Sequence, residues 1–244
     1  MTIGPASMHG RRVPHGLERA LAWIGVAALV VLAVVLVFRH DLFGSSGSSS
    51  ATKGSGHAIS QTRAVGPFTA VDLAGSNNVT IHVGGRRQVV VRADDNLINR
   101  VTTRVLAGRL VIANTPGSFT TSTPMSVEVT VPSLDALSLS GSGVISATAV
   151  KVPTLSVAIP GSGMFVATGT VTRLTVTIAG SGYAQLDRLV AENADATVSG
   201  SGSIHLNVTN RLNARVQGTG AIMYSGNPTH VTRSVTGSGA VVPT

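Results

Sequence analysis

The carboxylates of this chain are the residues best able to do chemistry, and they are few. Only eight acidic residues follow position 57, and Asp94–Asp95 is their one adjacent pair. Asp187, Glu192 and Asp195 lie close together in the sequence, across an expected outer turn. Clustered carboxylates hydrolyse glycans as an acid–base pair, or bind calcium in polysaccharide lyases. A helix cap or turn explains the adjacent pair at least as well, and a solvated loop explains the other three.

The remaining reactive side chains form no catalytic constellation. His82 and His205 each stand between apolar residues, in IHV and IHL, so strand alternation turns them outward one at a time. A metal site needs converging ligands, and a serine nucleophile needs a base and an orienting group. The absence of cysteine excludes disulfides, zinc ribbons and thiol catalysis. The sequence therefore predicts a protein without catalytic residues, metal or cofactor.

Composition and charge point to many short strands and away from nucleic acid. Hydrophobic residues make up 43% of the chain, whereas aromatic residues make up 3% and charged residues 11%. Gly, Val, Thr and Ser are abundant, as in strands joined by tight turns. The net charge of +8 is scattered, and after position 57 Arg86–Arg87 is the only adjacent basic pair. No basic run interleaved with aromatic residues is present, so nucleic-acid binding is not expected.

A glycine repeat dominates the second half of the chain. Pairs of glycines flank a serine, or once Thr219, at successive spacings of 20, 19, 20, 18 and 19 residues. Spacing of this regularity is typical of stacked-repeat proteins. The paired glycines are Gly141, Gly143, Gly161, Gly163, Gly180, Gly182, Gly200, Gly202, Gly218, Gly220, Gly237 and Gly239, and Gly75 begins a similar Gly-Ser-Asn corner.

The residues around each glycine pair alternate in the same register. Two positions before the first glycine stand Leu139, Ile159, Ile178, Val198, Val216 and Val235, and four positions after it stand Ile145, Phe165, Ala184, Ile204, Ile222 and Val241. Arg233 interrupts the apolar series four positions before. This period of two on both sides of a turn predicts strands with one buried face. The regular repeats, residues 135–244, therefore predict a β-solenoid with coils of about 19 residues.

Each Gly-Ser-Gly is expected to form a corner that stacks on the corner of the next coil. Glycine supplies the positive φ angles of a sharp corner and has no side chain to collide with the neighbouring coil. The serines are expected to form a column of hydroxyl groups. A phosphate-binding loop would need a helix after the glycines, and a strand pattern follows instead, so these glycines are interpreted as structural.

The chain before the regular repeats follows the scheme less closely. VDLAGSNNVTI (71–81) repeats the corner pattern, and the 66 residues from Gly75 to Gly141 correspond to about three coils, which predicts nine or ten coils in all. DDNLINRV (94–101) is expected to form a short helical turn capped by Asp94 or Asp95.

An anchor and a linker are expected to precede the solenoid. Residues 20–38 are 19 residues without a charge, enough to cross a membrane as a helix. More arginines precede this span than follow it, so residues 1–19 are expected to form a basic cytoplasmic tail and the later residues to lie outside the cell membrane. Residues 39–56 are predicted to be a Gly/Ser-rich linker, and residues 57–244 the extracytoplasmic domain.

Three motifs carry a resemblance to a known family: FTAVDLAGSNNVTI, VRADDNLINRV and LSLSGSGVISA, the last with its serial Gly-Ser-Gly corners. Together they resemble the auto-transporter adhesin head domain, also called the GIN domain, over about residues 57–244. The resemblance implies an all-β, right-handed parallel β-helix without identified catalytic residues, and a role in adhesion. The single span at the front departs from the family pattern and favours a cell-membrane anchor.

The expected function is non-catalytic: a membrane-anchored surface module of a bacterial envelope that binds, adheres or supports structure. A glycan or cell-wall ligand is the expected partner, and the last coil, which lacks an obvious cap, is expected to pair with a second copy or to fray. Two alternatives remain open. One is a polysaccharide-processing enzyme on a β-helix, and the other is the ectodomain of an envelope-stress sensor.

Overall fold

The chain folds into strands, as its alternating apolar residues predict. The computed structural model describes residues 51–244. In strand β4, Val79, Ile81 and Val83 are buried while their neighbours are not, the burial pattern of a strand with one face in the core. The elements are β1 (Thr52–Lys53), β2 (Ala58–Thr62), β3 (Ala70–Leu73), β4 (Asn78–Val83), β5 (Gln88–Asp94), the 3-10 helix η1 (Ile98–Arg100), β6 (Val101–Leu106), β7 (Arg109–Asn114), β8 (Phe119–Thr120), β9 (Ser126–Val131), β10 (Ala136–Leu139), β11 (Val144–Ile159), β12 (Met164–Ile178), β13 (Tyr183–Gly200), β14 (Ser203–Gly218), β15 (Ala221–Ser225), β16 (His230–Gly237) and β17 (Ala240–Pro243).

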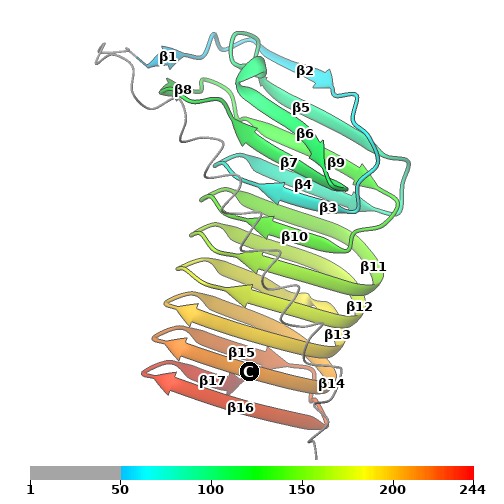
Figure 1. Ribbon diagram of the computed structural model, residues 1–244, viewed down its shortest axis with the longest axis vertical. Helices are drawn as coiled ribbons and strands as arrows, with labels where there is room; N and C mark the ends of the chain where they lie inside the picture. Colours follow the sequence, from blue (N-terminus) through cyan, green and yellow to red (C-terminus); the bar gives the residue numbers. More distant parts are fainter. Residues whose placement is uncertain (1–50) are drawn as a thin grey trace, which may run out of the picture. The chain divides into compact units, whose positions relative to one another are not determined.

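These strands stack as two faces of a β-solenoid, which confirms the predicted fold class (Figure 1). Each of the long strands β11 to β14 bends at an outer turn and contributes its first half to one face and its second half to the other. The face we call the β4 face runs in the order β2, β5, β9, β4, the first halves of β11 to β14, β15 and β17. The β3 face runs β6, β7, β3, β10, the second halves of β11 to β14 and β16.

The core lies between the two faces and consists of the columns that the repeat predicts. On the β3 face Leu139, Ile159 and Ile178 are fully buried, and on the β4 face Ile145 and Phe165 stand in neighbouring coils. Pairing between coils is parallel and in register, so each apolar side chain stacks on an equivalent one above and below. One continuous cluster of buried side chains results. This cluster gives residues 51–244 a hydrophobic core of their own, as a compact domain requires.

The glycine corners are required by close packing more than by backbone conformation. A Cβ on Gly202 would lie 2.6 Å from the carbonyl oxygen of Gly182 and 2.6 Å from Cγ2 of Ile178 in the preceding coil. Of the paired glycines, only Gly200, Gly218 and Gly237 have the positive φ that the sequence led us to expect. The middle hydroxyls approach one another at Ser201 and Thr219, where the oxygens are 3.0 Å apart.

The predicted order of the first coils is wrong. The sequence suggested about three coils in series between Gly75 and Gly141, but β10 pairs directly with β3, and the corner at Gly141 stacks on Gly75. The intervening chain passes to the other side of β3 and β4. There it forms one coil from β7 and β9, which pair with β3 and β4. Its strands β5 and β6, together with β2 from the preceding chain, form an end layer whose strands run antiparallel to their neighbours. The nine or ten serial coils are therefore replaced by fewer coils and an antiparallel end.

The last coil ends with a charged side chain in an interior column. Arg233 occupies the position held by Ala196 and Ala214 in the two preceding coils. Its guanidinium lies over the Tyr224 ring, 5.2 Å from the centroid, and donates a hydrogen bond to the Tyr224 hydroxyl. Inward-pointing charges discourage pairing at a strand edge. Association through β16 remains a prediction, and Arg233 weighs against it.

Within residues 51–244, no helix is long and apolar enough to cross a membrane. The expected tail at 1–19, the span at 20–38 and the linker up to residue 50 lie outside the described residues.

Candidate binding surfaces

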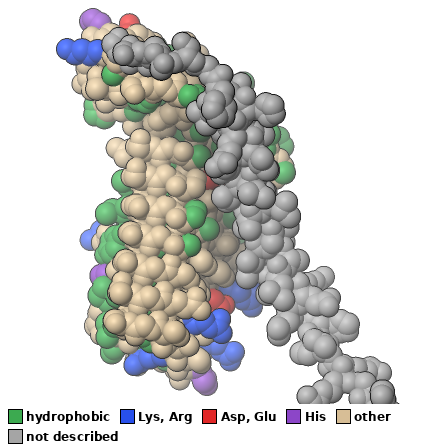
Figure 2. Space-filling model, turned by 60° about the vertical axis from the view of Figure 1, so that its left-hand side comes forward, with side chains coloured by type: hydrophobic (Ala, Val, Ile, Leu, Met, Phe, Trp, Pro, Cys, Tyr) green, Lys and Arg blue, Asp and Glu red, His purple; other side chains and the backbone are tan. Residues whose placement is uncertain are grey.

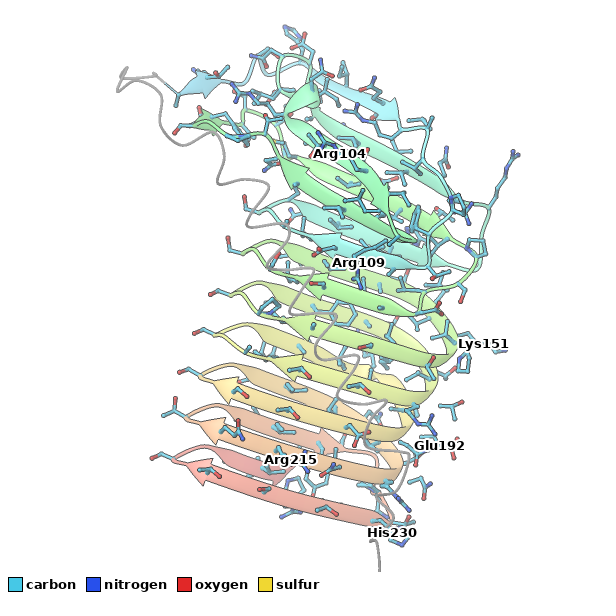
Figure 3. All side chains as sticks on the ribbon, viewed as in Figure 1. Arg104, Arg109, Lys151, Glu192, Arg215 and His230 are labelled. Atoms are coloured by element: carbon cyan, nitrogen blue, oxygen red, sulfur yellow. The ribbon has the colours of Figure 1, made fainter. Side chains whose placement is uncertain are left out.

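The three carboxylates that could have formed a catalytic group project from different parts of the solenoid. Asp195 lies on the β3 face, where its Oδ1 accepts a hydrogen bond of 3.2 Å from Asn213 Nδ2. Glu192 projects from the outer turn (Figure 3), where it lines an open depression of about 520 Å³ with Lys151. Asp187 lies before that turn, in the first half of β13. Residues 51–244 contain no group of three His, Asp or Glu side chains able to hold a metal ion.

Asp94 is a structural clasp instead of a helix cap. The 3-10 helix η1 has Leu97 at its N-cap and no capping side chain, so the predicted cap is wrong. The fully buried Asp94 carboxylate accepts hydrogen bonds from Gly56 N–H at 2.9 Å, from Ser122 N–H at 2.9 Å, and from the N–H and hydroxyl of Thr123 at 3.3 and 3.1 Å. It thereby joins the chain before β2 to the loop before β9.

The two adjacent carboxyls of this clasp are both held in their ionised form. Burial acts to raise the pKa of Asp94, but the hydrogen bonds from Ser122, Thr123 and Gly56 outweigh it and lower the pKa below its ordinary value. The pKa of Asp95 is lowered by hydrogen bonds from the Ser55 hydroxyl and from Asn96 N–H. Both oxygens of the Asp94 carboxylate accept hydrogen bonds from the protein itself. Asp94 therefore has a structural role and is not available for catalysis.

The β4 face presents a row of outward-facing apolar and aromatic side chains, of which Met164 is exposed and the others are half-buried. Val144, Met164 and Tyr183 are partners in successive coils, immediately after each corner, and Met164 is 39% exposed. In the next column His205 lies beside Tyr183, with ring centroids 5.1 Å apart and planes at 69°. Met223 follows His205 in that column. We call these five residues the β4-face ladder.

The ladder lies beside the corner edge of the solenoid. Figure 2 shows that edge as an uncharged column of corner backbone and small side chains, with hydrophobic side chains along its left flank.

The prediction that His205 points outward is confirmed, since its side chain is half-exposed and lies between the buried Ile204 and Leu206. His82 is also exposed, and its Nδ1 is 2.8 Å from the Thr148 hydroxyl. The two histidines lie in different columns and in coils that are not adjacent.

The β3 face has a different chemistry. Its central outward positions carry small side chains, among them Ala136, Ser156 and Thr175 in one column. Arg215 and His230 lie toward its last coils and Arg109 toward its first (Figure 3). The β4-face ladder is therefore the larger set of bulky outward-facing side chains in register.

Sequence reasoning missed the ladder, although a signal for it was present. The outward residue directly after each second glycine is Val144, Met164 and Tyr183 in three consecutive repeats. Outward positions of a strand are usually polar, so three bulky residues at one repeated position indicate a surface with a partner.

Comparisons with known proteins agree with the fold. Residues 67–228 match the family described as "Putative auto-transporter adhesin, head GIN domain". A crystal structure described as a putative adhesin from Bacteroides fragilis is similar, with a TM-score of 0.68 and 21% identity, over 80% of this chain and 100% of that chain. A structure described as a putative lipid binding protein from Parabacteroides distasonis has a TM-score of 0.55 and 20% identity, over 80% and 100% of the two chains. No curated protein was found to match.

Proposed function

The chain belongs to the GIN-domain family of auto-transporter adhesin heads, and on that premise we propose that it is a non-catalytic binding module that adheres through its β4 face. The observation that carries the proposal is the β4-face ladder, whose bulky side chains repeat in register on a rigid stack of coils. A regular spacing of about 4.8 Å lets several coils contact one extended ligand at the same time. The related crystal structure from Bacteroides fragilis, described as a putative adhesin, supports the same interpretation.

A neutral glycan of the cell wall or of another cell is the ligand that this surface suits best. Saccharide rings have an apolar face that stacks on aromatic side chains, and hydroxyl groups that need hydrogen-bonding partners. Tyr183 offers the aromatic ring, and Gln185 and His205 offer polar atoms in the adjoining column. The ladder itself contains no acidic or lysine/arginine side chain, which favours an uncharged partner.

Binding of residues 51–244 to a glycan and cell-wall array, with mass spectrometry of the bound material, tests this proposal. We expect saturable binding and no cleavage product. Tyr183→Ala should weaken binding by roughly tenfold, as removal of an aromatic anchor from an interface does. Thr175→Ala, on the β3 face, is the matched control and should leave binding unchanged. A cleaved glycan would contradict the non-catalytic role, and the absence of any ligand would contradict the adhesive one.

We also propose that residues 20–38 anchor the domain in the cell membrane with its solenoid outside. The support is their uncharged sequence and the excess of arginine before it. The full-length protein should stay in the membrane fraction after alkaline extraction, and protease added to intact spheroplasts should digest the solenoid. Replacing Val30 and Val34 with aspartate should release the protein from the membrane, because charges at the middle of a span oppose insertion. Protection of the solenoid from protease in intact spheroplasts would reverse the proposed orientation.

A further inference from the structure

A basic groove lies at the antiparallel end of the solenoid, away from the β4-face ladder. It has a volume of about 710 Å³ and lies between the end of β2, the loop from β4 to β5, and Pro132 after β9. Three arginines line it, Arg63, Arg86 and Arg87. None of its lining residues within the described chain is acidic. Three arginines therefore border one groove.

Arg63 is held rigidly at the wall of this groove. Its backbone N–H bonds to Val89 O at 2.8 Å. Its Nη2 donates to Ile98 O at 2.9 Å and more weakly to Val101 O at 3.4 Å. Its Nε is buried and has no hydrogen-bond partner. A guanidinium has five N–H donors, so Arg63 is fixed in place with donors to spare.

Arg87 is held against an aromatic ring, and its Nε, like that of Arg63, has no hydrogen-bond partner. Its guanidinium carbon is 5.7 Å from the centroid of the Phe68 ring, and Phe68 itself is buried. The Nε of Arg87 is buried and has no partner either. Gly84 and Gly85 lead into the arginine pair. Gly84 has a φ of +108°, and a Cβ on Gly85 would come 2.6 Å from Cγ2 of Thr130, so the turn that presents the arginines depends on glycine.

Unsatisfied buried donors on two arginines need an explanation, because buried polar groups almost always find a partner. Like charges without a counter-charge also repel one another in a partly desolvated space. An oxyanion with several acceptor oxygens satisfies both needs, since guanidinium forks pair with phosphate in two-point contacts. The groove has the size of a small-molecule site and is much larger than one inorganic ion, so the anion would belong to a larger organic group.

We propose that this groove binds the phosphate of an organic phosphate ester, with Arg63 and Arg87 as fixed donors and Arg86 as an exposed third charge. Phospholipid headgroups and soluble glycerol phosphates both carry such a phosphate ester, which is the group that the arginines would bind. The site is independent of the proposed glycan-binding ladder. Each could be present without the other.

Nuclear magnetic resonance of arginine side chains in residues 51–244 tests the proposal directly. Addition of glycerol 3-phosphate should shift the Nε–H signals of Arg63 and Arg87 in a saturable way, and glycerol should not. Arg87→Gln and Arg86→Gln should each weaken the affinity by about tenfold, the loss expected for a charge-assisted hydrogen bond. Arg92→Gln, on β5 outside the groove, is the matched control with the same loss of charge. Arg86 is exposed, so its replacement should leave folding intact.

Vesicles distinguish the two sources of the phosphate. An anionic headgroup would be identified as the ligand if the protein sediments with phosphatidylglycerol vesicles but not with phosphatidylcholine vesicles. In that case Arg86→Gln should lose vesicle binding and Arg92→Gln should retain it. Binding of glycerol 3-phosphate with no vesicle binding would identify a soluble ester. Equal weakening by Arg86→Gln and Arg92→Gln would overturn the proposal, because it would show attraction to net charge alone. Failure to bind either probe would also overturn it. Tyr183→Ala should bind both probes normally, which separates this result from the glycan test.

Discussion

Replacing Gly202 with alanine is expected to lower the free energy of unfolding by about 3 kcal/mol, the upper range for overpacking a tight interior. The new Cβ would lie 2.6 Å from the carbonyl oxygen of Gly182 and 2.6 Å from Cγ2 of Ile178. Neither atom can move aside easily, because one belongs to the backbone of the preceding coil and the other to the packed core. Urea denaturation of residues 51–244, followed by circular dichroism, measures the change.

Gly66→Ala is the matched control for this prediction. No heavy atom lies within 4 Å of the position of its Cβ, and its φ lies outside the left-handed region. The same chemical change should therefore be neutral, or should stabilise the domain by up to about 1 kcal/mol, because alanine lowers the conformational entropy of the unfolded chain. A Gly202→Ala protein as stable as the Gly66→Ala protein would show that adjacent coils can move apart, and that the corner glycines are not required for stacking.

Replacing Asp94 with asparagine is expected to lower the melting temperature by about 10 °C at neutral pH, as loss of several charge-assisted hydrogen bonds from a buried group should do. An amide has one acceptor oxygen, whereas the carboxylate accepts from Gly56, Ser122 and Thr123 with both oxygens. The amide nitrogen would also point its hydrogens at backbone N–H groups. Differential scanning calorimetry measures the change.

The same substitution should change the dependence of stability on pH. The folded-state pKa of Asp94 is lower than the ordinary value of 3.8. The stability that the ionised Asp94 contributes to the folded state is therefore fully present above pH 3.8. It is lost as the pH falls from there toward the folded-state pKa. The difference in melting temperature between wild type and Asp94→Asn should shrink below about pH 4.

Asp72 and Asp95 remain in both proteins, so the comparison isolates Asp94. Burial raises the pKa of Asp72, against hydrogen bonding from Ser138 and the charge of Arg109, and gives it the opposite effect on stability. Asp95 acts in the same direction as Asp94. A difference between the two proteins that stayed constant from pH 7 to pH 2 would show that ionisation of Asp94 contributes nothing to the clasp.

The regular coils could be predicted from the sequence because their information is local and repeated. An apolar residue two positions before each glycine pair, such as Ile159 or Ile178, fixes both the face that is buried and the register with the next coil. A slip of one residue would expose the whole column. Strand type, corner position and core columns all follow from that period, and the structure confirms them.

The order of the first coils could not be predicted in this way. VDLAGSNNVTI has the same corner pattern as the later repeats, and nothing within it specifies its neighbours. Stacking of β3 and β4 between β10 and the β7–β9 coil depends on contacts between segments far apart in the sequence. Asp94 illustrates the same limit, because its partners Gly56 and Ser122 lie on distant loops.

The candidate sites were missed for a related reason. Arg63 and Arg87 are isolated charges in the sequence, and only the antiparallel end of the fold brings them to one groove. Tyr183 and His205 belong to different repeats and meet across a coil boundary. Absence of a catalytic cluster was expected from the sequence. The surfaces proposed for binding depend on outward residues, whose type is not constrained by the repeat.

The position of β3 and β4 also determines when the domain can begin to assemble during synthesis. This coil is made first, but both of its neighbours are made later, β7 and β9 on one side and β10 with the start of β11 on the other. A nascent chain that has exposed only residues 70–83 has two open strand edges and no template. The β3–β4 coil has both of its neighbours only after the first half of β11 has been synthesised, and each later coil can then pair with an edge that is already in place.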